Sequence, residues 1–550
     1  MVSGEERADV VIIGSGFGGA VAARRLAPTG RRVVVLERGR DWSESKTPQR
    51  FRDYLYSSRM PHLLNGWLDM RVLDQMVVAT GAGVGGGSLI YANVCVNAEP
   101  SYFHTGWPSQ ITPDVMAPYY ELVGDMLTPQ HVPPGQVNPR MTLLEKAAGE
   151  LGWGLKHKSL PLAVTFDQTV TDTGGVPWRD PGAYAPGTCV HCGNCVIGCE
   201  SDAKNTLDKN YLKEAKEDHG AEIWPLSMVT HIEEGPGGTW RVHYLKVDEG
   251  LRHRKREIVG NIVILAAGSI GSPEILLRSR DGFRTLKNLP RALGRGWSPN
   301  GDFLTLARYK NRGPLHPTKG PTIGGVIDLL DGVDLPDDNM IGYDGRIFVE
   351  DGGLPNFGAH LLKAWKEKRG PKGWAFRKAS DLTDFSDMIP WFGQSIDAAD
   401  GEFSLQNPLR FWRARTRLDW NPQRSVSALD TFNDVHVAMT LATGGEPIPS
   451  LTWKRLRMLV TPHPLGGCNM AAAAGAGVTN HMGEVFGYDN LFVMDGSVIP
   501  RAIGRNPSKT IAAVAERSCE KLLEELPRRL NGATAVQRGA MPAARYAAST

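Results

Sequence analysis

The sequence lacks long apolar runs, an excess of either charge, and a recognisable secretory leader. No apolar run reaches the roughly 18 residues that a transmembrane helix needs, so we expect no membrane span. The 62 Lys and Arg residues nearly balance the 59 Asp and Glu residues and are mostly scattered, which gives no reason to expect nucleic acid as a partner. Residues 1–7 lead directly into a predicted strand, without the apolar stretch and cleavage site of a signal peptide. We therefore expect a cytoplasmic protein.

Cysteine is scarce, with seven residues in 550, yet four of the seven fall in one short segment. Successive thiolates at the spacing C-x2-C-x2-C-x3-C can converge on an iron–sulfur cluster, which is our first expectation. Structural zinc is the second, although it usually takes two C-x-x-C pairs a dozen or more residues apart. Free thiols and a redox disulfide are further alternatives. The candidate metal ligands are Cys189, Cys192, Cys195 and Cys199.

The rest of the composition is that of a globular protein. With 41% hydrophobic and 22% charged residues, a chain of 550 residues is long enough for two or more domains. We expect the Ala-, Gly- and Arg-rich tail 531–550 to be a mobile extension. Residues 363–378 combine three aromatic with seven basic side chains. A solvated surface is the usual structure of such a segment, and peripheral contact with an anionic membrane or an acidic electron-carrier protein is the alternative.

A nucleotide-binding unit opens the chain. Residues 8–13 fit a buried parallel strand, and a glycine-rich turn and a helical pattern follow directly. The first glycine of such a turn permits the tight bend, the second lets the backbone approach a pyrophosphate, and the third lets helix and strand pack closely. The next strand, 32–36, ends in Glu37, which can accept hydrogen bonds from both ribose hydroxyls and would repel a 2′-phosphate. The candidate cofactor-binding residues of the turn are Gly14, Gly16, Phe17, Gly18 and Gly19.

Three later segments predict further parts of the same sheet and site. Residues 81–90 form a second glycine-rich loop, and glycine at this density indicates backbone pressed against a ligand or another segment. An apolar strand at 261–265 runs into a small-residue turn and a helix, and a strand at 491–494 ends in an acid, where ligands bind in open α/β sheets. The candidate cofactor-binding residues here are Gly81, Gly83, Gly86, Gly87, Ser88, Ala267, Gly268, Asp495 and Gly496.

These motifs resemble those of the glucose-methanol-choline (GMC) oxidoreductases, and within them the cholesterol oxidase-like branch. The most specific part is the closing half, where residues 463–468 (HPLGGC), 495–500 (DGSVIP) and 504–507 (GRNP) follow in the order and approximate spacing of that branch. The resemblance implies FAD as the cofactor and the oxidation of an alcohol to a carbonyl. It also implies the fold class, a Rossmann-like α/β domain that binds FAD with a discontinuous α+β substrate-binding domain on an antiparallel sheet.

The resemblance also predicts the domain limits. The FAD-binding domain takes residues 1–105, 200–302 and 460–530, and the substrate-binding domain takes residues 106–199 and 303–459. The cysteine segment 189–199 then lies at the junction of the two domains.

Alcohol oxidation needs a base that removes the hydroxyl proton while a hydride leaves for the flavin. His463 is the candidate base, because histidine titrates near neutrality. The motif around it favours a catalytic role over that of an ordinary core histidine. Asn506 resembles the family's second polar residue, which holds the substrate oxygen or polarises the reduced flavin, with a helix cap as the alternative. Glu350 lies where cholesterol oxidases carry a carboxylate that moves a proton during double-bond isomerisation, and an ordinary turn at 351–353 is the equal alternative. The resemblance also places Asn93, Asn506 and Pro507 beside the flavin.

The expected substrate is a hydrophobic small-molecule alcohol. A sterol or other bulky secondary alcohol is the first candidate, and a sugar, terpenoid or aliphatic alcohol is the alternative. The cysteine segment favours a dehydrogenase, which passes electrons through an iron–sulfur cluster to a carrier protein, over an oxidase. A lyase of the same fold and an electron-transfer flavoprotein are the other function classes. The tryptophans expected in the substrate-binding domain suit a broad apolar cavity or an ordinary core: Trp365, Trp374, Trp391, Trp412, Trp420 and Trp453.

Overall fold

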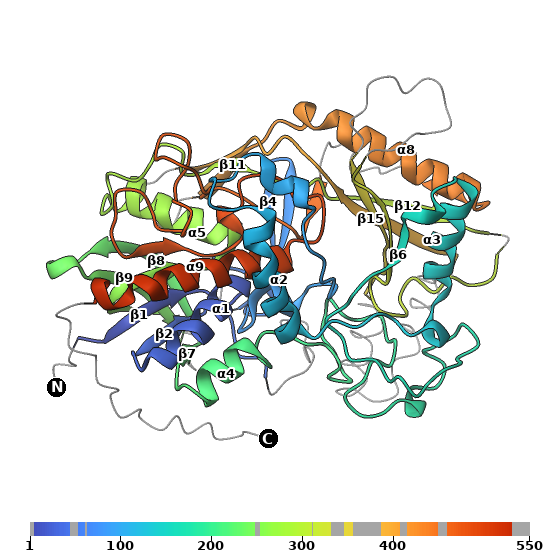
Figure 1. Ribbon diagram of the computed structural model, residues 1–550, viewed down its shortest axis with the longest axis horizontal. Helices are drawn as coiled ribbons and strands as arrows, with labels where there is room; N and C mark the ends of the chain where they lie inside the picture. Colours follow the sequence, from blue (N-terminus) through green and yellow to red (C-terminus); the bar gives the residue numbers. More distant parts are fainter. Residues whose placement is uncertain are drawn as a thin grey trace.

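The computed structural model has two parts that meet at a central cavity. Figure 1 shows the first part, with helices α1 and α9, on the left, and the second, with α3 and α8, on the right. The basic segment 363–378 and the tail 531–550 lie outside the described residues, as do Trp365, Trp374, Trp412 and Trp453. The described residues are 5–43, 53–60, 63–247, 253–310, 312–331, 346–355, 387–406, 415–448 and 459–530.

The first part is built on a seven-stranded sheet assembled from distant segments. Its strand order is β7-β2-β1-β10-β9-β8, and β20 also pairs with β10. Strands β1, β2, β7 and β20 join the second half of β10 in a parallel arrangement, while β8, β9 and the first half of β10 form an antiparallel meander. The strands are β1 (Arg7–Ile13), β2 (Val33–Leu36), β7 (Glu222–Trp224), β8 (Ser227–Glu234), β9 (Trp240–Val247), β10 (His253–Leu265) and β20 (Leu491–Val493).

The central parallel strands are continuous apolar runs because helices cover the sheet around them. Helix α1 packs against α9 and α4, and α2 packs against α9. Helix α5 follows β10 in the same way that α1 follows β1, which confirms the Rossmann-like unit predicted from the sequence. The helices of this part are α1 (Phe17–Leu26), α2 (Pro113–Leu127), α4 (Tyr211–Glu217), α5 (Gly268–Leu277) and α9 (Ser508–Arg529).

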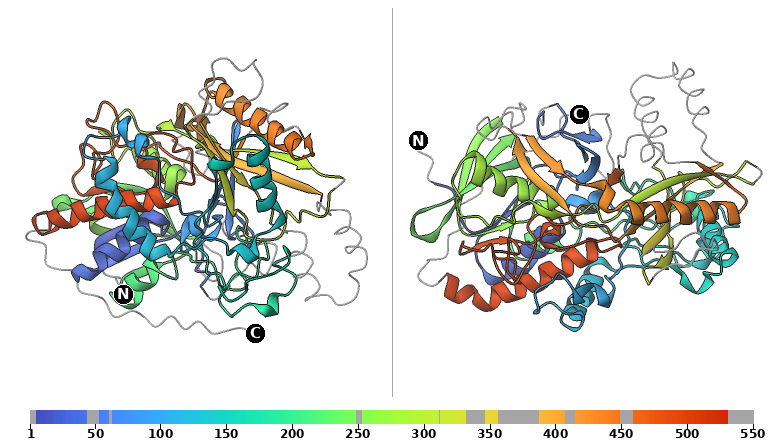
Figure 2. Two further views of the ribbon diagram at one scale, coloured as in Figure 1. Left: turned by 45° about the vertical axis from the view of Figure 1, so that its right-hand side comes forward. Right: turned by 90° about the horizontal axis from the view of Figure 1, so that it is seen from above.

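The second part is a six-stranded antiparallel sheet in the order β18-β12-β15-β14-β13-β6. Helices α3 (Pro139–Glu150) and α8 (Val426–Ala442) pack on one face of this sheet and on each other (Figures 1 and 2). The opposite face is turned to the cavity, which confirms the predicted antiparallel substrate-side sheet, while the exact domain limits stay a prediction. The strands are β6 (His157–Ser159), β12 (Phe303–Arg308), β13 (Gly325–Leu329), β14 (Ile347–Asp351), β15 (Met388–Ser395) and β18 (Glu446–Ile448).

Two smaller sheets complete the described structure. The four-stranded sheet β19-β5-β4-β3 places β19, which precedes His463, beside β5, which leads into the second glycine loop. The three-stranded sheet has the order β11-β16-β17. Their strands are β3 (Leu55–Tyr56), β4 (Leu68–Leu73), β5 (Met76–Gly81), β11 (Arg295–Trp297), β16 (Gly401–Gln406), β17 (Arg415–Asp419) and β19 (Leu459–Thr461).

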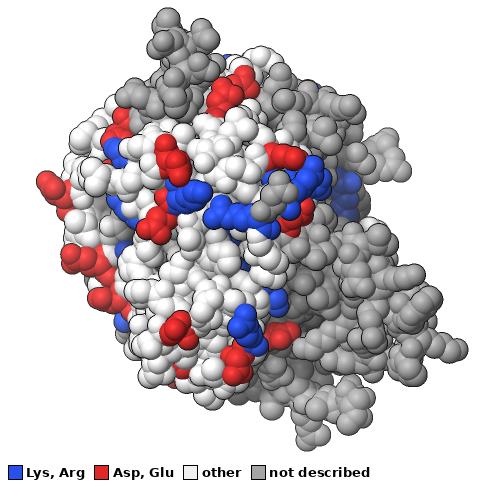
Figure 3. Space-filling view, turned by 90° about the vertical axis from the view of Figure 1, so that its right-hand side faces the viewer, with Lys and Arg blue, Asp and Glu red and all other residues white. Residues whose placement is uncertain are grey.

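The charges on the surface agree with the balanced numbers of acidic and basic residues, and the helices agree with the lack of long apolar runs. On the face that Figure 3 shows, acidic and basic side chains lie interspersed among uncharged ones. Within the part of the chain that the structure describes, no helix is both long and apolar enough to cross a membrane.

Candidate active site

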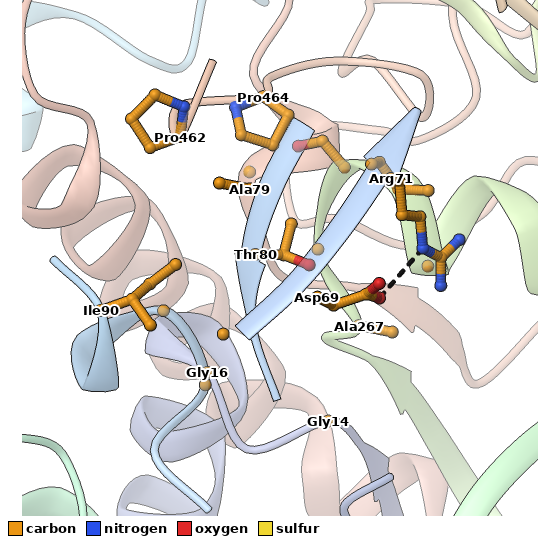
Figure 4. Close-up of a pocket in the computed structure, with 18 of the residues that line it drawn as sticks. Gly14, Gly16, Asp69, Arg71, Ala79, Thr80, Ile90, Ala267, Pro462 and Pro464 are labelled. Carbon is orange, nitrogen blue, oxygen red and sulfur yellow. Dashed lines mark hydrogen bonds and ion pairs between the residues drawn. The ribbon is translucent and has the colours of Figure 1, made fainter. Parts of the chain in front are cut away.

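A cavity of about 1210 Å³ connects the glycine-rich turn after β1 with the antiparallel sheet of the second part. This volume exceeds the roughly 300–1,000 Å³ of sites that hold one small ligand, so the cavity has room for a cofactor and a second molecule. Figure 4 shows Gly14, Gly16 and Ala267 at one end of the view and Pro462 and Pro464 at the other, with strands β4 and β5 between them.

The glycines of the first turn have different neighbours. A Cβ atom on Gly14, whose φ is +101°, would lie 2.4 Å from the Ala266 carbonyl oxygen, and one on Gly18 would lie 1.5 Å from the Met494 carbonyl oxygen. A Cβ on Gly19 would meet the Gly14 carbonyl oxygen at 2.0 Å. Around Gly16, by contrast, no described atom lies within 4 Å of such a Cβ. Gly14, Gly18 and Gly19 therefore allow the chain to pack, while Gly16 leaves the backbone open to a ligand.

Glu37 ends β2 and is buried beside this turn. Its Oε2 atom accepts hydrogen bonds from the Ser15 backbone nitrogen at 3.1 Å and the Ser15 hydroxyl at 2.7 Å, and its Oε1 atom accepts one from the Gly39 nitrogen at 2.9 Å. A carboxylate has about four lone-pair positions, so one acceptor position remains for a ribose hydroxyl. Glu37 thus supports the turn and still lines the cavity.

The second glycine loop packs directly on the first. A Cβ atom on Gly86 would lie 2.6 Å from the Gly16 Cα atom, and one on Gly81 would lie 2.1 Å from the Gly86 carbonyl oxygen. The Ser88 hydroxyl donates to the Gly85 carbonyl oxygen at 2.7 Å and accepts from the Leu207 nitrogen at 3.1 Å. The density of glycine in this loop is therefore explained by contact with another segment of chain, and Gly86 and Gly87 also line the cavity. A Cβ on Gly83 would meet the Trp42 side chain.

Asn93 and Asp495 lie in the same region. Asn93 is fully buried with a left-handed φ of 71°, and neither polar atom of its amide has a hydrogen-bond partner among the described residues. Asp495 accepts hydrogen bonds from the Gly268 nitrogen at 2.9 Å and the Ser272 hydroxyl at 2.5 Å, which joins β20 to the start of α5. Burial raises the pKa of Asp495. The unpartnered Asn93 amide and the open backbone at Gly16 fit a polar cofactor such as FAD.

His463 follows β19 and lines the cavity next to Pro464. Its ring Nδ1 atom lies 2.9 Å from the Oδ1 atom of Asp302, and its backbone nitrogen donates to the Thr461 hydroxyl at 2.9 Å. Because Nδ1 is engaged with a carboxylate, Nε2 is the ring nitrogen that remains for a ligand. Burial raises the pKa of Asp302, and the contacts with His463 and Thr461 oppose that rise.

Glu350 and Asn506 lie beside this pair. Glu350 is directly opposite Phe392 in the β14–β15 ladder, so both side chains share the cavity-facing side of the sheet. Its Oε2 atom accepts a hydrogen bond from the Gln394 amide at 3.1 Å, and its carboxyl interacts with the Asn506 side chain. Asn506 lines the cavity together with Pro507, and its Oδ1 atom has no partner among the described residues. Burial raises the pKa of Glu350 well above its usual range, which favours the neutral form of this carboxyl.

The structure therefore brings the three predicted catalytic residues together. His463 and Asn506 both line the cavity, and Glu350 interacts electrostatically with Asp302, the partner of His463. The neighbouring Asp351 is part of a separate buried ion pair with Arg140 at 3.3 Å. Sequence reasoning missed Asp302, which carries no local signal because its contact with His463 spans 161 residues.

The cysteine segment also lies against the cavity. Val196 lines it, and the buried Lys204 ammonium donates to the carbonyl oxygens of Cys195, Leu89 and Tyr91 at 2.6, 2.9 and 3.0 Å. The chain winds tightly here, with positive φ at His191, Gly193 and Gly198. Lys204 thus joins the cysteine segment to the second glycine loop.

The four thiols do not form a metal site in this structure. All seven cysteines are free, and among the residues described no group of three or more His, Cys, Asp or Glu side chains is arranged to hold a metal ion. Burial raises the pKa of Cys192 to about 12 and that of Cys189 well above its usual range, which favours protonated thiols. The expectations of an iron–sulfur cluster and of zinc at Cys189, Cys192, Cys195 and Cys199 therefore gain no support.

Known proteins match this chain over nearly its whole length. Two family models described as GMC oxidoreductase match residues 173–293 and 407–515, and a model for an NAD(P)-binding Rossmann-like domain matches residues 12–76. A cholesterol oxidase of Mycobacterium tuberculosis (strain CDC 1551 / Oshkosh) is 32% identical over 93% of this chain and 90% of its own length. A cholesterol oxidase of Acinetobacter baumannii is 28% identical over 93% of each chain.

Solved structures share the fold. The crystal structure of pyridoxine 4-oxidase from Mesorbium loti superposes with a TM-score of 0.62 at 17% identity, and the match covers 94% of this chain and 99% of that one. At this identity the likeness concerns the fold alone.

Proposed function

This chain belongs to the GMC oxidoreductase family, and from that premise we propose that it oxidises a bulky, hydrophobic secondary alcohol to a ketone, with a sterol as the first candidate. The family assignment makes it an FAD-dependent oxidoreductase of CH–OH donors. The observation that carries the proposal is a single cavity that joins the glycine-rich turn to His463 and Asn506.

The sterol proposal is supported by the relatives and by the cavity wall. Both cholesterol oxidases quoted above align with more than nine-tenths of this chain. The antiparallel sheet offers the cavity an apolar surface from Leu304, Pro390 and Phe392, which occupy the same face of neighbouring strands. A flat, apolar ligand would bury its surface there, while its single hydroxyl group would need the few polar atoms near His463.

FAD, when bound, supplies the hydride acceptor of this chemistry. Gly16 and Glu37 would hold it along the first part of the cavity, where the backbone is open at Gly16 and one acceptor position of Glu37 remains. Asp495 already accepts four hydrogen bonds from Gly268, Ser272 and Ser497, so it would form the wall beside the cofactor. The protein contributes the proton transfer: the Nε2 atom of His463 removes the hydroxyl proton of the alcohol as the hydride departs from the same carbon. The Asn506 Oδ1 atom, which has no partner among the described residues, is placed to accept a hydrogen bond from the substrate or the cofactor.

Glu350 is proposed to act as a neutral carboxylic acid. Burial raises its pKa and so favours the protonated form, which can donate a hydrogen bond as well as accept one. Its contact with the Asn506 side chain orients that amide toward the cavity. A further role for Glu350 in moving a proton during double-bond isomerisation, as in the cholesterol oxidases it resembles, stays a prediction.

The proposal is tested by adding alcohols to the FAD-loaded protein without oxygen and following the flavin absorbance. Cholesterol should bleach the flavin faster than a sugar or a primary aliphatic alcohol. His463→Gln should slow bleaching by about 10²–10⁴-fold, the usual contribution of a general base, while the flavin stays bound. His104→Gln, which changes an exposed histidine, is the matched control and should bleach at the wild-type rate.

Failure has two distinct forms. Absence of bleaching with every alcohol would favour a lyase or an electron-transfer flavoprotein. Normal bleaching in His463→Gln would remove this residue from the base role.

The finer part of the proposal concerns the electron acceptor. We propose that the reduced cofactor is reoxidised mainly by an acceptor other than oxygen, so that the enzyme is a dehydrogenase. The support is the position of the cysteine segment, which reaches the cavity at Val196 and is joined to the second glycine loop by Lys204. Among the described residues the four thiols are not arranged to bind a metal, so the proposal names no cluster as the electron carrier.

The acceptor is tested by first reducing the enzyme with its alcohol and then mixing it with either air-saturated buffer or a ferricenium salt. A dehydrogenase should be reoxidised by ferricenium within the turnover time and by oxygen more slowly. Reoxidation by oxygen at the turnover rate would identify an oxidase instead. Iron and acid-labile sulfide, measured on protein purified without oxygen, would reveal a cluster independently of activity.

A further inference from the structure

A buried carboxylate lies directly behind the proposed base. Asp302 is 1% exposed and precedes β12, while His463 follows β19. One oxygen of Asp302, Oδ1, lies 2.9 Å from His463 Nδ1, and the other, Oδ2, lies 2.5 Å from the Thr461 hydroxyl oxygen. Both oxygens of the carboxylate are therefore engaged, one by the cavity-lining His463 and the other by the buried Thr461 behind it.

The hydrogens at this site can be assigned by counting donors. The Thr461 hydroxyl has one hydrogen, and its oxygen also accepts a hydrogen bond from the His463 backbone nitrogen at 2.9 Å. It lies 2.5 Å from Asp302 Oδ2 and 3.0 Å from the Pro299 carbonyl oxygen, which already accepts from the Asp302 nitrogen at 3.3 Å. The shorter contact takes the hydroxyl hydrogen, so Thr461 donates to Asp302. With the His463 ring in the tautomer that carries its hydrogen on Nδ1, Asp302 accepts on both oxygens, which is the pattern of an ionised carboxylate.

An ionised Asp302 has two effects on His463. It holds the hydrogen of the neutral ring on Nδ1, which leaves the lone pair of Nε2 in the cavity to take a proton. It also stabilises the charged ring that forms when that proton arrives. We propose that Asp302 is the positioning residue for His463 and that the Thr461 hydroxyl holds Asp302 in place. This inference rests on the proposed function, because it assumes that His463 is the base.

Two other carboxyl groups lie within electrostatic range of Asp302. Burial raises the pKa of Glu350 well above the usual range, which favours its neutral form. Asp397, whose pKa burial raises to about 6, accepts hydrogen bonds from the Ser298 hydroxyl, the Gly301 nitrogen and the Ala399 nitrogen. Asp397 has no hydrogen bond to His463 among the described contacts. It therefore provides a matched control, a second buried aspartate of the same region whose loss would leave the contact between Asp302 and His463 in place.

The test is the pH dependence of flavin reduction in Asp302→Asn, with Asp397→Asn as the control. Asp302→Asn should lower the rate of reduction at the optimum by about 10²-fold or more, within the range for disabling a general base. The apparent affinity for the alcohol should change much less, because Asp302 does not line the cavity. The acidic limb of the rate profile should move to lower pH, because protonation of the ring is less favourable without the carboxylate. Asp397→Asn should leave the limb in place.

A pair of threonine variants gives a second test. Thr461→Ser keeps the hydroxyl and should retain the wild-type rate within a few fold. Thr461→Val keeps the shape without the hydroxyl and should lower the rate by about tenfold, the equivalent of one lost hydrogen bond of roughly 1.4 kcal/mol. If Asp302→Asn does not bind flavin, the contrast between these two variants decides the question.

The inference would be overturned if Asp302→Asn reduced flavin at the wild-type rate with an unchanged acidic limb of its pH profile. Equal rates of flavin reduction in the two threonine variants would also overturn it. His463→Gln separates this failure from a failure of the proposed function. If His463→Gln reduces flavin normally, then the proposed base is wrong. If it does not, but Asp302→Asn does, then only the positioning role is wrong.

Discussion

Glu350 shows at the scale of one residue how burial sets a protonation state. Its carboxyl group is fully buried on the cavity side of the antiparallel sheet and interacts with Gln394 and Asn506, both of them uncharged. Burial dominates and raises its pKa well above the usual value of 4.5, and the nearby carboxyl groups of Asp351 and Asp302 add to that rise. A neutral acid beside Asn506 is the consequence.

This raised pKa predicts a pH-dependent cost to the fold. Below the ordinary pKa of glutamate, the folded and unfolded chains both hold the proton. As the pH rises above that value, the unfolded chain releases the proton first, so the free energy of unfolding falls by up to about 1.4 kcal/mol per pH unit until the folded pKa is reached. Glu350→Gln does not titrate and should therefore gain stability relative to wild type as the pH rises.

Urea unfolding of both proteins at about pH 5 and about pH 8 measures this difference. Glu150→Gln, which changes an exposed glutamate on α3, is the control and should show the same small difference at both pH values. A stability difference for Glu350→Gln that does not grow with pH would mean that Glu350 is ionised in the folded protein.

The sequence predicted those residues of the site that stand in short, recognisable motifs. His463 stands in a six-residue motif, and Asn506 stands before a proline in another, so both could be found from neighbouring letters. Asp302 could not, because its role depends on how the start of β12 meets the end of β19. The cysteine spacing allows a metal site, but spacing does not decide whether the backbone turns all four thiols toward one point.

At the scale of elements, the turn after β1 contains glycines with two different functions. Gly18 allows close packing, and Gly16 leaves room for a ligand. Gly18→Ala would force a Cβ atom to within 1.5 Å of the Met494 carbonyl oxygen, so it should destabilise the protein by about 3 kcal/mol or more. Gly16→Ala places its Cβ in open space, so the FAD-free fold should keep its stability within about 1 kcal/mol. Its affinity for FAD should nevertheless fall by at least roughly tenfold, because the new methyl group occupies the ligand's path.

Thermal unfolding without FAD and FAD titration by fluorescence quenching separate the two effects. Gly149→Ala, in α3 with no described atom within 4 Å of its Cβ, is the control and should stabilise the helix slightly without a change in FAD affinity. Equal FAD affinity in Gly16→Ala and wild type would show that the cofactor does not approach this turn.

Elements were predictable where neighbours in sequence are neighbours in space. Strand β1, helix α1 and strand β2 form one continuous unit, and their apolar runs and glycines specify it locally. The second sheet pairs β6 with β13 and β12 with β18, segments that are far apart in the chain. That sheet was predicted from the family resemblance, because apolar periodicity does not specify which distant strands pair. The β4–β5 hairpin that borders the cavity was not foreseen although its strands are adjacent in sequence, because its two-residue turn, Asp74 and Gln75, lacks the Asn-Gly or Asp-Gly signal of a hairpin.

At the scale of the whole molecule, the function depends on two parts that meet at one cavity. The first part supplies the turn and loop that fit FAD, and the second supplies an apolar wall for the alcohol. His463, Asp302 and Asn506 come from the segments where these parts join. Neither part alone contains both a cofactor site and a substrate surface, which is why the family resemblance, rather than any single motif, was needed to predict the reaction.

The central claim is that a hydride passes from the carbinol carbon of a bulky alcohol to FAD while the protein removes the hydroxyl proton. The most direct test is stopped-flow reduction of the enzyme-bound flavin by cholesterol and by cholesterol deuterated at C3, without oxygen. The account predicts that the flavin is bleached and that the deuterated sterol bleaches it more slowly, because the broken C–H bond is the one that carries the hydride. Absence of bleaching with the sterol would contradict this claim. Identical bleaching rates with the two isotopologues would also contradict it, provided that the chemical step limits the rate.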